Sequence, residues 1–295
     1  MIASDLLLGI DWGTSNRRAY LMHRDGRCLA QHADGQGMLA VGGKFVESLA
    51  ALRREMTVDE QVPTVMSGMV GSASGWQEVP YLDTAVPLAA LPAHLVPVAG
   101  YPGCHIVPGY CDRSSGVDVM RGEEAQLLGA VALGILDGWL VLPGTHSKWV
   151  YLQEGKVAQL ATYMTGELFA MLAAGGTLSA LMGPGVDDEA AFVAGMQEAQ
   201  RGWSLSNTLF GVRARVVARD MPAEKARSFV SGLLIGTEFN DAQRQQGSVI
   251  NLIASHALSS RYASAAAHFG MQARVLDPDE VYRAALVRFF EKVEL

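Results

Sequence analysis

The feature that most constrains the fold is a stretch near the start of the chain, residues 6–20, which reads LLLGIDWGTSNRRAY. Its apolar start is typical of a buried strand, and a second apolar run returns after a polar bend that contains glycine. The pattern predicts a β-hairpin. Gly13 allows the backbone to approach a ligand closely, and successive N–H groups in such a bend can bind phosphate. Asp11, at the end of the first strand, suits a divalent cation that accompanies phosphates. A tight turn with a hydrogen-bonded aspartate is the structural alternative.

A second stretch of the chain repeats this design. Gly13-Thr14 in the first copy corresponds to Gly144-Thr145 in the second, and Arg17 corresponds to Lys148. Both copies follow an apolar strand, and both end in an acidic-Gly-basic tip. Such self-similarity indicates that the chain contains two related halves. Two bends of this kind that face each other could hold a polyphosphate from both sides.

The two copies differ at the position of the acidic residue. Leu142 stands in the second copy where Asp11 stands in the first. Only the first hairpin is therefore predicted to handle a metal ion. In the second hairpin His146 replaces Ser15 and can still donate to phosphate, although a histidine in a loop is commonly just solvated.

Composition and charge exclude several classes of protein. The 295 residues are 49% hydrophobic and 18% charged, which indicates a globular chain, and the net charge is −7. The chain therefore lacks the excess of positive charge that would attract nucleic acid or an anionic membrane. Three cysteines without a C-x-x-C pair are typical of a reducing compartment and make zinc an unfavoured ligand. With an N-terminus that does not resemble a signal peptide and a longest apolar run of only residues 127–136, we expect a cytoplasmic protein without membrane contact.

Strand and helix patterns alternate along the rest of the chain, which predicts an α/β fold. We expect strands at residues 62–66, 104–107, 139–142, 249–254 and 273–276. We expect helices at residues 45–56, 119–136, 164–182, 188–200, 222–246, 256–270 and 278–293. Asp118 is placed as the cap of the second of these helices and Asp277 as the cap of the last. A change of character before Asp118 predicts an N-terminal lobe of residues 1–116 and a C-terminal lobe of residues 117–295, with the last helix free to pack back on the first lobe.

Two further segments carry glycines that suggest close approach. In the helix at residues 222–246, Gly232 and Gly236 are four residues apart and lie on one face, where another helix or a ligand could approach. The segment at residues 67–81, SGMVGSASGWQEVPY, suits a loop that lines a ligand, and a surface loop fixed by Trp76 is equally compatible with it.

Six segments, in this order, resemble the 2-dehydro-3-deoxygalactonokinase family of the sugar kinase, Hsp70 and actin superfamily. They are IDWGTSNRRAYL, SGMVGSASGWQEVPY, DVMRGEEAQLLGA, LPGTHSKWV, TYMTGELFAML and SGLLIGTEF. The resemblance implies an α/β chain with the two-lobed ribonuclease H-like (actin-like ATPase) fold, with ATP and substrate in the cleft between the lobes. It also implies transfer of the ATP γ-phosphoryl group to the 6-hydroxyl of 2-dehydro-3-deoxy-D-galactonate, in the degradation of galactonate.

The resemblance further implies roles for individual residues. Mg²⁺ would be handled by Asp11. The phosphates of ATP would meet the two hairpins, and the adenosine would meet the long helix and the turn VINLIASHAL, where this chain has alanine in place of the family's glycine. These cofactor residues are Gly13, Thr14, Ser15, Gly144, Thr145, His146, Gly232 and Ala254. The catalytic base of similar kinases is an aspartate that opens a helix, which implies Asp118, with Asp112 as the competitor.

The sugar acid needs its own contacts. Because the substrate is a carboxylate, an arginine is expected beside it, and the candidates are Arg17, Arg113 and Arg121. Each of the three could instead form a surface ion pair. Gly71, Ser72 and Trp76 would line the sugar site, although a packed aromatic is the alternative for Trp76.

Other functions stay open at this stage. One is a kinase for another sugar or amino sugar of the same superfamily, and a second is a non-catalytic sugar-responsive regulator, which the acidic charge disfavours. An actin-like or Hsp70-like ATPase is a third. The sequence contains no G-x-x-x-x-G-K-[ST] motif and no H-E-x-x-H motif. It leaves the oligomeric state open, with a homodimer as one alternative.

Overall fold

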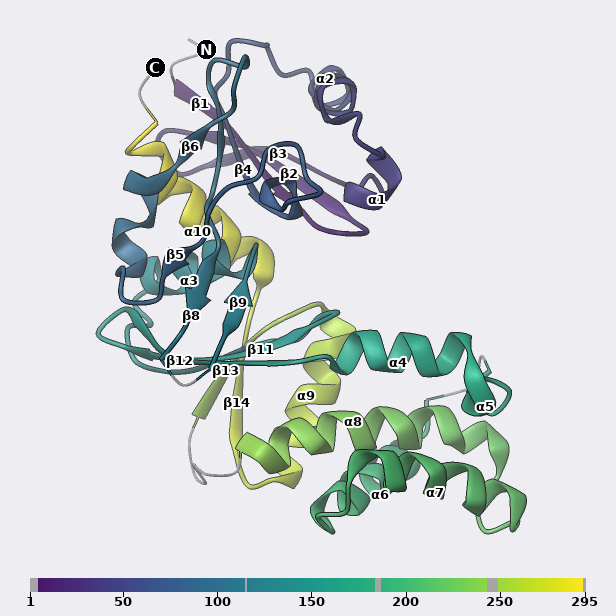
Figure 1. The fold of residues 1–295 in the computed structure, drawn as a ribbon. Helices are drawn as coiled ribbons and strands as arrows, with labels where there is room; N and C mark the ends of the chain where they lie inside the picture. Colours follow the sequence, from purple (N-terminus) through teal and green to yellow (C-terminus); the bar gives the residue numbers. More distant parts are fainter. Residues whose placement is uncertain (1–4, 115, 184–186, 243–248, 294–295) are drawn as a thin grey trace. The chain divides into compact units, whose positions relative to one another are not determined.

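The computed structural model describes residues 5–114, 116–183, 187–242 and 249–293, and Figure 1 shows the course of the chain. Contacts between Cα atoms divide it into two compact units. Unit 1 consists of Met1–Asp137, Val150–Leu160 and Asp277–Leu295, and unit 2 consists of Gly138–Trp149 and Ala161–Leu276. The lobe border between residues 116 and 117 stays a prediction.

The first hairpin belongs to a six-stranded sheet with the order β3-β2-β1-β4-β7-β6. Its strands are β1 (Leu6–Trp12), β2 (Arg17–His23), β3 (Cys28–Asp34), β4 (Thr64–Gly68), β6 (Val96–Pro97) and β7 (Cys104–Ile106). β1 pairs antiparallel with β2 and parallel with β4, and β4 pairs parallel with β7. The hairpin at residues 6–20 is therefore confirmed, and β1 leads its polar bend to the same edge as the carboxyl end of β4.

The two faces of β1 meet different helices. Leu8, Ile10 and Trp12 join a buried cluster that also contains Phe45 and Leu49 of α2 (Phe45–Glu55). Each fully buried side chain of this kind contributes about 1.5–3 kcal/mol to folding. The short helix α1 (Met38–Val41) precedes α2. The alternation of side chains along the strand therefore leaves positions 7, 9 and 11 on the opposite face.

That opposite face is covered by α10 (Pro278–Phe290), which begins with Asp277 as N-cap and proline at its first turn, as predicted. A Cβ at Gly9 would collide with the side chain of Leu286 in α10, so glycine lets the last helix lie close to β1. α10 also packs on α3 (Glu123–Ala132), where Gly129 lies against the backbone of Val281.

A small sheet with the order β5-β8-β9 corrects the start of a predicted helix. Its strands are β5 (Leu82–Asp83), β8 (Tyr110–Asp112) and β9 (Asp118–Met120). The helix expected from residue 119 with Asp118 as its cap instead begins at Glu123, and residues 118–120 pair with β8. The chain turns at Gly122, whose φ of +109° is a conformation that side chains rarely adopt. The 3₁₀ helices η2 (Met69–Gly71) and η3 (Leu88–His94) complete this region.

The second hairpin lies in a five-stranded sheet with the order β12-β11-β10-β13-β14. Its strands are β10 (Gly138–Leu142), β11 (Ser147–Gln153), β12 (Lys156–Tyr163), β13 (Val249–Ile253) and β14 (Gln272–Leu276). β13 pairs parallel with both β10 and β14. In both sheets three consecutive strands are followed by two parallel ones, so the repeat in the sequence extends to the topology.

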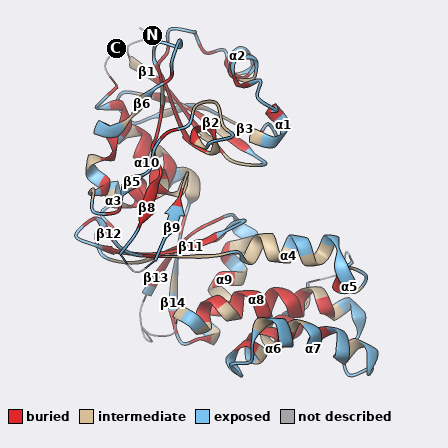
Figure 2. Cartoon of the chain, viewed as in Figure 1, coloured by how far each residue is buried: buried red, intermediate tan, exposed pale blue. Residues whose placement is uncertain are grey.

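Helices make up most of unit 2. They are α4 (Thr165–Ala174), α5 (Gly176–Ser179), α6 (Glu189–Gln200), α7 (Leu205–Val217), η4 (Ala223–Lys225), α8 (Ala226–Ala242) and α9 (His256–His268). The single helix expected at residues 164–182 is divided, because Gly176 has a φ of +77°. α8 is buried along most of its length (Figure 2). Its expected continuation to residue 246 lies outside the described residues.

Among the described residues, none of the helices combines the length and the apolar character that crossing a bilayer would require.

Candidate active site

The bend of the first hairpin is a tight turn supported from behind. The N–H of Gly13 donates to the carbonyl of Asn16 at 2.9 Å, and the carbonyls of Gly13 and Thr14 accept from Met38 and Leu39 at the start of α1. Gly37 lies directly against this turn, and a Cβ there would be 2.6 Å from the nitrogen of Asn16. The contacts with Gly37 and α1 therefore fix the position of the turn, and Ser15 is exposed.

Asp11 lies on the α10 face of β1 and is part of a charged cluster. Arg18, its partner in β2, donates to the Asp11 carboxylate at 2.7 Å and lies 3.6 Å from Asp279 of α10. Tyr20 donates to the same Asp279 at 2.7 Å. Burial opposes the charge of Arg18, but the two carboxylates raise its pKa above the ordinary value. Asp11 is thus oriented by an arginine and keeps an exposed fraction of 18%.

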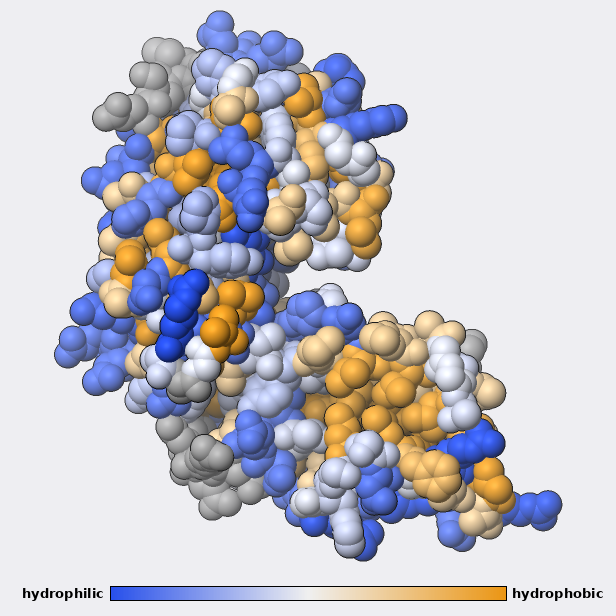
Figure 3. Space-filling view, viewed as in Figure 1, coloured by the Kyte–Doolittle hydropathy of each residue, from blue (hydrophilic) through white to orange (hydrophobic). Residues whose placement is uncertain are grey.

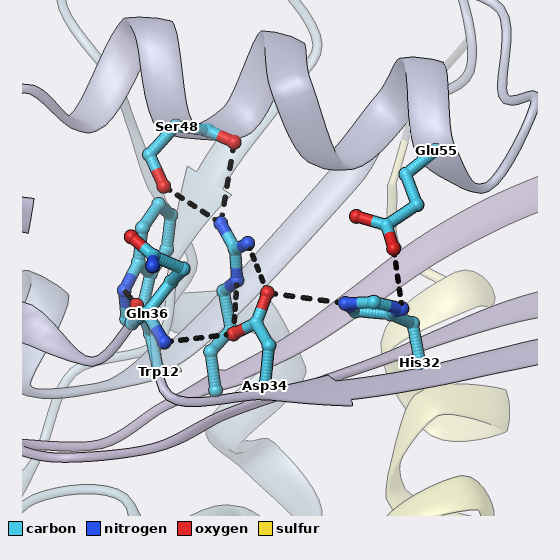
Figure 4. A network of polar contacts seen from close by, with 7 residues as sticks. Trp12, His32, Asp34, Gln36, Ser48 and Glu55 are labelled. Atoms are coloured by element: carbon cyan, nitrogen blue, oxygen red, sulfur yellow. Dashed lines mark hydrogen bonds and ion pairs between the residues drawn. The ribbon is translucent and has the colours of Figure 1, made fainter.

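Arg17 lies on the α2 face of the sheet and is fully engaged there by Asp34 and Ser48, which Figure 4 labels. It forms two hydrogen bonds to Asp34, the shorter of 2.6 Å, and two to Ser48, and its guanidinium lies over the ring of Trp12. Its exposed fraction is only 2%. Although partial burial opposes ionisation of Asp34, Arg17 and the N–H of Gln36 hold the pKa of Asp34 below its ordinary value. These contacts give Arg17 a structural role, and we do not retain it as a ligand of the sugar acid.

The loop at residues 67–81 brings two predicted substrate residues together. The Nη1 atom of Arg121 would be 2.8 Å from a Cβ at Gly71, so the guanidinium lies directly over this glycine. Arg121 donates from Nη2 to the carbonyl of Val79 at 2.7 Å and stacks over Tyr81. Its Nη1 atom is buried without a hydrogen-bond partner among the residues that the structure describes. An unsatisfied cationic donor of this kind favours an anionic ligand.

Ser72 and Trp76 lie nearby in different settings. The hydroxyl of Ser72 donates to Met69 and approaches the sulfur of Met38, which links this loop to α1 and so to the first hairpin. Trp76 stacks parallel to Phe45 at 6.2 Å between ring centroids and packs against the core of unit 1. This arrangement favours the packed aromatic over a sugar wall for Trp76.

The two candidate bases occupy the same end of a hairpin. Asp112 and Asp118 are register partners in the antiparallel pair of β8 and β9. Asp112 is buried and accepts from the N–H of Ser114 at 2.9 Å, while Asp118 is partly exposed. Arg113, in the loop between them, is exposed.

The start of α3 carries acidic residues that sequence analysis did not single out. Glu123 accepts from the N–H of Arg121, and Glu124 accepts from the N–H of Gly122 at 2.6 Å. Glu124 is completely buried, and its second oxygen has no partner within the described part of the chain. Burial, followed by the nearby Glu123, raises the pKa of Glu124 to about 8.

Glycines bring this helix start next to the first hairpin. A Cβ at Gly68 would be 2.6 Å from the carbonyl of Trp12, and a Cβ at Gly122 would be 3.2 Å from the Cα of Gly68. Three backbone segments therefore meet without side chains between them. The predicted metal residue Asp11, the loop after β4 and the acidic start of α3 lie in one region of unit 1.

The bend of the second hairpin is supported by α4. The carbonyl of Thr145 accepts from the N–H of Glu167 at 2.9 Å, and Gly166 lies directly against Gly144 and Thr145. His146 forms a 2.6 Å contact with the carboxylate of Glu167. Gly144, Thr145 and His146 are all exposed, whereas the next residue, Ser147, is buried. The predicted phosphate residues are therefore accessible and oriented by their neighbours.

A cavity of about 260 Å³ adjoins this bend within unit 2. It is lined by Gly144, Thr165, Gly166, Phe169, Arg227, Ser231, Leu234, Ile235, Ala257, Leu258, Arg261 and Tyr262. Apolar side chains gather on the face of this unit that α4 and α8 form (Figure 3). An apolar pocket with a few polar groups is the usual form of a small-molecule site. Its position beyond the carboxyl end of β10 also matches the place where open α/β sheets bind ligands.

The two predicted adenosine residues are placed differently. Ala254 is buried at the end of β13, three residues before Ala257 of the cavity wall. Gly232 faces α6, because a Cβ there would collide with the backbone of Phe192. The sequence left open whether a helix or a ligand approaches Gly232. In the structure the neighbouring helix α6 approaches it, and residues on other faces of α8 line the cavity.

Comparisons with known proteins identify the family. The sequence model of the 2-keto-3-deoxy-galactonokinase family matches residues 11–289. The chain belongs to this family. It is 35% identical over 286 residues to the 2-dehydro-3-deoxygalactonokinase of Escherichia coli (strain K12), covering 95% of each chain. It is 34% identical over 296 residues to the Probable 2-dehydro-3-deoxygalactonokinase DgoK1 of Rhizobium meliloti (strain 1021), covering 97% of each.

Solved structures agree with this assignment. A crystal structure from Sinorhizobium meliloti, provisionally named as a 2-dehydro-3-deoxygalactonokinase, superposes with a TM-score of 0.88 at 34% identity and covers 95% of this chain and 94% of its own. The (R)-2-hydroxyglutaryl-CoA dehydratase component A of Acidaminococcus fermentans gives a TM-score of 0.54 at 9% identity, covers 98% of each chain, and shows the fold alone. The predicted family and the two-lobed α/β fold class are thus confirmed.

Proposed function

We propose that the chain is an ATP-dependent kinase that phosphorylates the 6-hydroxyl of 2-dehydro-3-deoxy-D-galactonate. Membership of the 2-keto-3-deoxy-galactonokinase family is the observation that carries this proposal. The names of the relatives from E. coli and R. meliloti support the substrate. The product is 2-dehydro-3-deoxy-6-phospho-D-galactonate, with ADP as the second product.

The cavity beside the second hairpin is our proposed site for the nucleoside of ATP. Its apolar side chains suit a nucleobase, and Arg227 and Arg261 supply positive charge for an anionic ligand. Gly144 belongs both to the cavity wall and to the hairpin bend. A nucleoside bound there would have its phosphates next to Thr145 and His146, whose N–H and side-chain groups can donate to them.

Asp11 is our proposed contact for Mg²⁺. Mg²⁺ needs only one or two carboxylates because substrate phosphates and water complete its coordination. The structure fits this limited demand, since Asp11 is partly exposed beside the hairpin bend. In the described residues, clusters of three or more His, Cys, Asp or Glu able to hold a metal are absent. When bound, the ion would neutralise charge on the transferring phosphoryl group.

The chemical step needs a base for the 6-hydroxyl. The hydroxyl oxygen forms a bond to the γ-phosphorus, the bond from that phosphorus to the bridging oxygen breaks, and the hydroxyl proton passes to a carboxylate. Asp118 stays our first candidate, with Asp112 as its competitor. Because the resemblance places the base where a helix opens, and α3 opens at Glu123, Glu123 becomes a third candidate.

The sugar acid is proposed to bind in unit 1 near Arg121. The guanidinium of Arg121, whose Nη1 atom over Gly71 has no partner among the described residues, supports this arginine as the contact for the carboxylate. Ser72 stays in the proposed site, and Arg113 is an exposed second candidate. Trp76 contributes more to the core than to this site. A cytoplasmic location is a further proposal that the cysteine usage supports, and a homodimer stays one alternative for the oligomeric state.

A coupled assay that follows ADP release over a panel of aldonates, 2-keto-3-deoxy acids and hexoses tests the function. We expect 2-dehydro-3-deoxy-D-galactonate to give the highest kcat/KM. Preference for a hexose or an amino sugar would favour the alternative kinase, and nucleotide binding without turnover of any sugar would favour a regulator.

A further inference from the structure

Glu238 of α8 is the most buried acidic residue of unit 2, with an exposed fraction of 1%. Its Oε2 atom accepts from Ser147 Oγ and from Trp149 Nε1, both at 2.9 Å. Its Oε1 atom accepts from Tyr262 Oη at 2.7 Å. Thr165 contributes a further hydrogen bond. One carboxylate is thus satisfied by side chains from three other elements.

These partners have a common location. Ser147 directly follows the bend of the second hairpin, Thr165 begins α4 beneath that bend, and Tyr262 lies on α9. Thr165 and Tyr262 also line the cavity, as do four residues of α8. The hairpin bend, α4, α8 and α9 all contribute to the cavity wall, and each of them is therefore joined to the Glu238 carboxylate.

The physical state of Glu238 agrees with this connecting role. Burial raises its pKa, while the hydrogen bonds from Thr165, Trp149, Tyr262 and Ser147 lower it. A buried carboxylate costs free energy unless its oxygens are hydrogen-bonded. An apolar side chain could fill the same space without this cost, so a polar group here points to a need for fixed geometry.

We propose that Glu238 is a positioning residue that fixes the phosphate-binding bend of the second hairpin relative to the nucleoside cavity. It acts through Ser147 and Tyr262 and contacts neither ligand. As a consequence, the cavity and the bend are the correct distance apart to bind the nucleobase and the phosphates of one ATP molecule. This inference rests on the proposed function, because it assumes that ATP occupies the cavity and the bend together.

The test compares adenosine with the magnesium complex of a non-hydrolysable ATP analogue, by isothermal titration calorimetry on the full chain. Adenosine uses the cavity alone, whereas the analogue also uses the bend. In Glu238→Leu the ratio of the two dissociation constants, which measures the affinity gained from the phosphates, should fall about tenfold or more. Glu238→Gln keeps two acceptor lone pairs for Ser147 and Trp149 and can donate to Tyr262, so its ratio should stay within about threefold of wild type.

Two further variants make the test selective. Glu198→Gln removes another carboxylate of unit 2, one that binds Arg215, and should leave the ratio unchanged. Ser147→Ala removes one of the bonds and should lower the ratio by about threefold, which keeps the test possible if the leucine variant does not fold. An unchanged ratio in folded Glu238→Leu, or in Ser147→Ala, would overturn the inference. Wild-type protein that binds neither ligand would instead contradict the proposed function.

Discussion

Asp112 and Asp118 lie directly opposite each other across β8 and β9, at the end of the pair where a short loop joins the strands. The Cβ atoms of such register partners are about 4.5–5.5 Å apart, and like charges in this arrangement repel each other. Both carboxylates accept from the backbone, Asp112 from the N–H of Ser114 and Asp118 from the N–H of Val119, and Asp118 is the more exposed of the two. Exposure makes Asp118 the better placed to receive a proton from a substrate.

Replacement of the catalytic base should affect kcat specifically. If Asp118 is the base, Asp118→Asn should lower kcat by about 100-fold to 10,000-fold, the usual contribution of a positioned base, with little change in KM for ATP. Asp112→Asn should cost much less because that carboxylate is buried. Steady-state kinetics with both substrates varied measures these effects. Full activity in Asp118→Asn together with inactive Glu123→Gln would assign the base to the start of α3.

Much of the fold could be predicted because its signals are local. The hairpin at residues 6–20, the helix capped by Asp277 and the parallel strand before Ala254 each have a strong apolar period or a cap. β3 was missed because its sequence, CLAQHAD, is half polar and only half buried. The helix α7 was missed for the same reason, since it buries only Thr208 and Val212.

The start of α3 shows where local signals mislead. Asp118 is a good helix cap by residue type, but Asp118–Met120 pairs with β8, a short strand just before it in the sequence that carries no strong pattern of its own. Tertiary pairing therefore overrode the local preference. Gly122 was the available signal, because a glycine before two glutamates can mark a turn into a helix.

The site was less predictable than the fold because function depends on what each side chain contacts. Arg17 and Arg121 are equivalent by residue type, yet one is saturated by Asp34 and Ser48, while the other has a buried Nη1 atom that no described residue bonds. Glu124 and Glu238 have no spacing that distinguishes them from exposed glutamates of a helix. Their importance follows from burial, which sequence alone does not give.

The two arginines should respond differently to substitution. Arg17→Met removes the buried partner of Asp34, and loss of one member of a buried pair costs about 3–5 kcal/mol of unfolding free energy. Because Asp34 is one-fifth exposed, we expect the lower part of that range. Urea denaturation measures it. Arg121→Met should instead raise KM for the sugar acid about tenfold or more, since a charge-assisted contact would be lost.

The outcome for KM separates the two roles. A folded Arg17→Met variant should keep the KM of wild type for the sugar acid, and an increase comparable to that of Arg121→Met would return Arg17 to the substrate site.

Stability should fall as the pH rises through the neutral range because of Glu124. Its carboxyl group has a pKa of about 8 in the folded chain against an ordinary value of 4.5. Between these values the unfolded chain has released the proton and the folded chain retains it. The unfolding free energy should therefore decrease with pH in this window, by at most about 1.4 kcal/mol per pH unit from this group.

Glu124→Gln is the matched variant for this effect. The amide does not titrate, so the variant should have a flatter dependence of unfolding free energy on pH between 5 and 8. Urea denaturation at four pH values in this range gives both curves. Identical slopes for wild type and variant would show that Glu124 does not retain its proton in the folded chain.

The contact between α6 and α8 should be highly sensitive to an added methyl group. A Cβ at Gly232 would collide with the backbone carbonyl of Phe192, and backbone cannot move aside as a flexible side chain can. Gly232→Ala should therefore destabilise the protein by about 3 kcal/mol, at the upper end of the usual cost of overpacking.

Gly211→Ala on α7 is the control, because a Cβ there would meet no described residue within 4 Å. It should raise stability by about 0.5–1 kcal/mol, since alanine loses less conformational freedom in a helix. Thermal and urea unfolding measure both changes, and a Gly232→Ala variant as stable as wild type would mean that α6 does not pack this closely on α8.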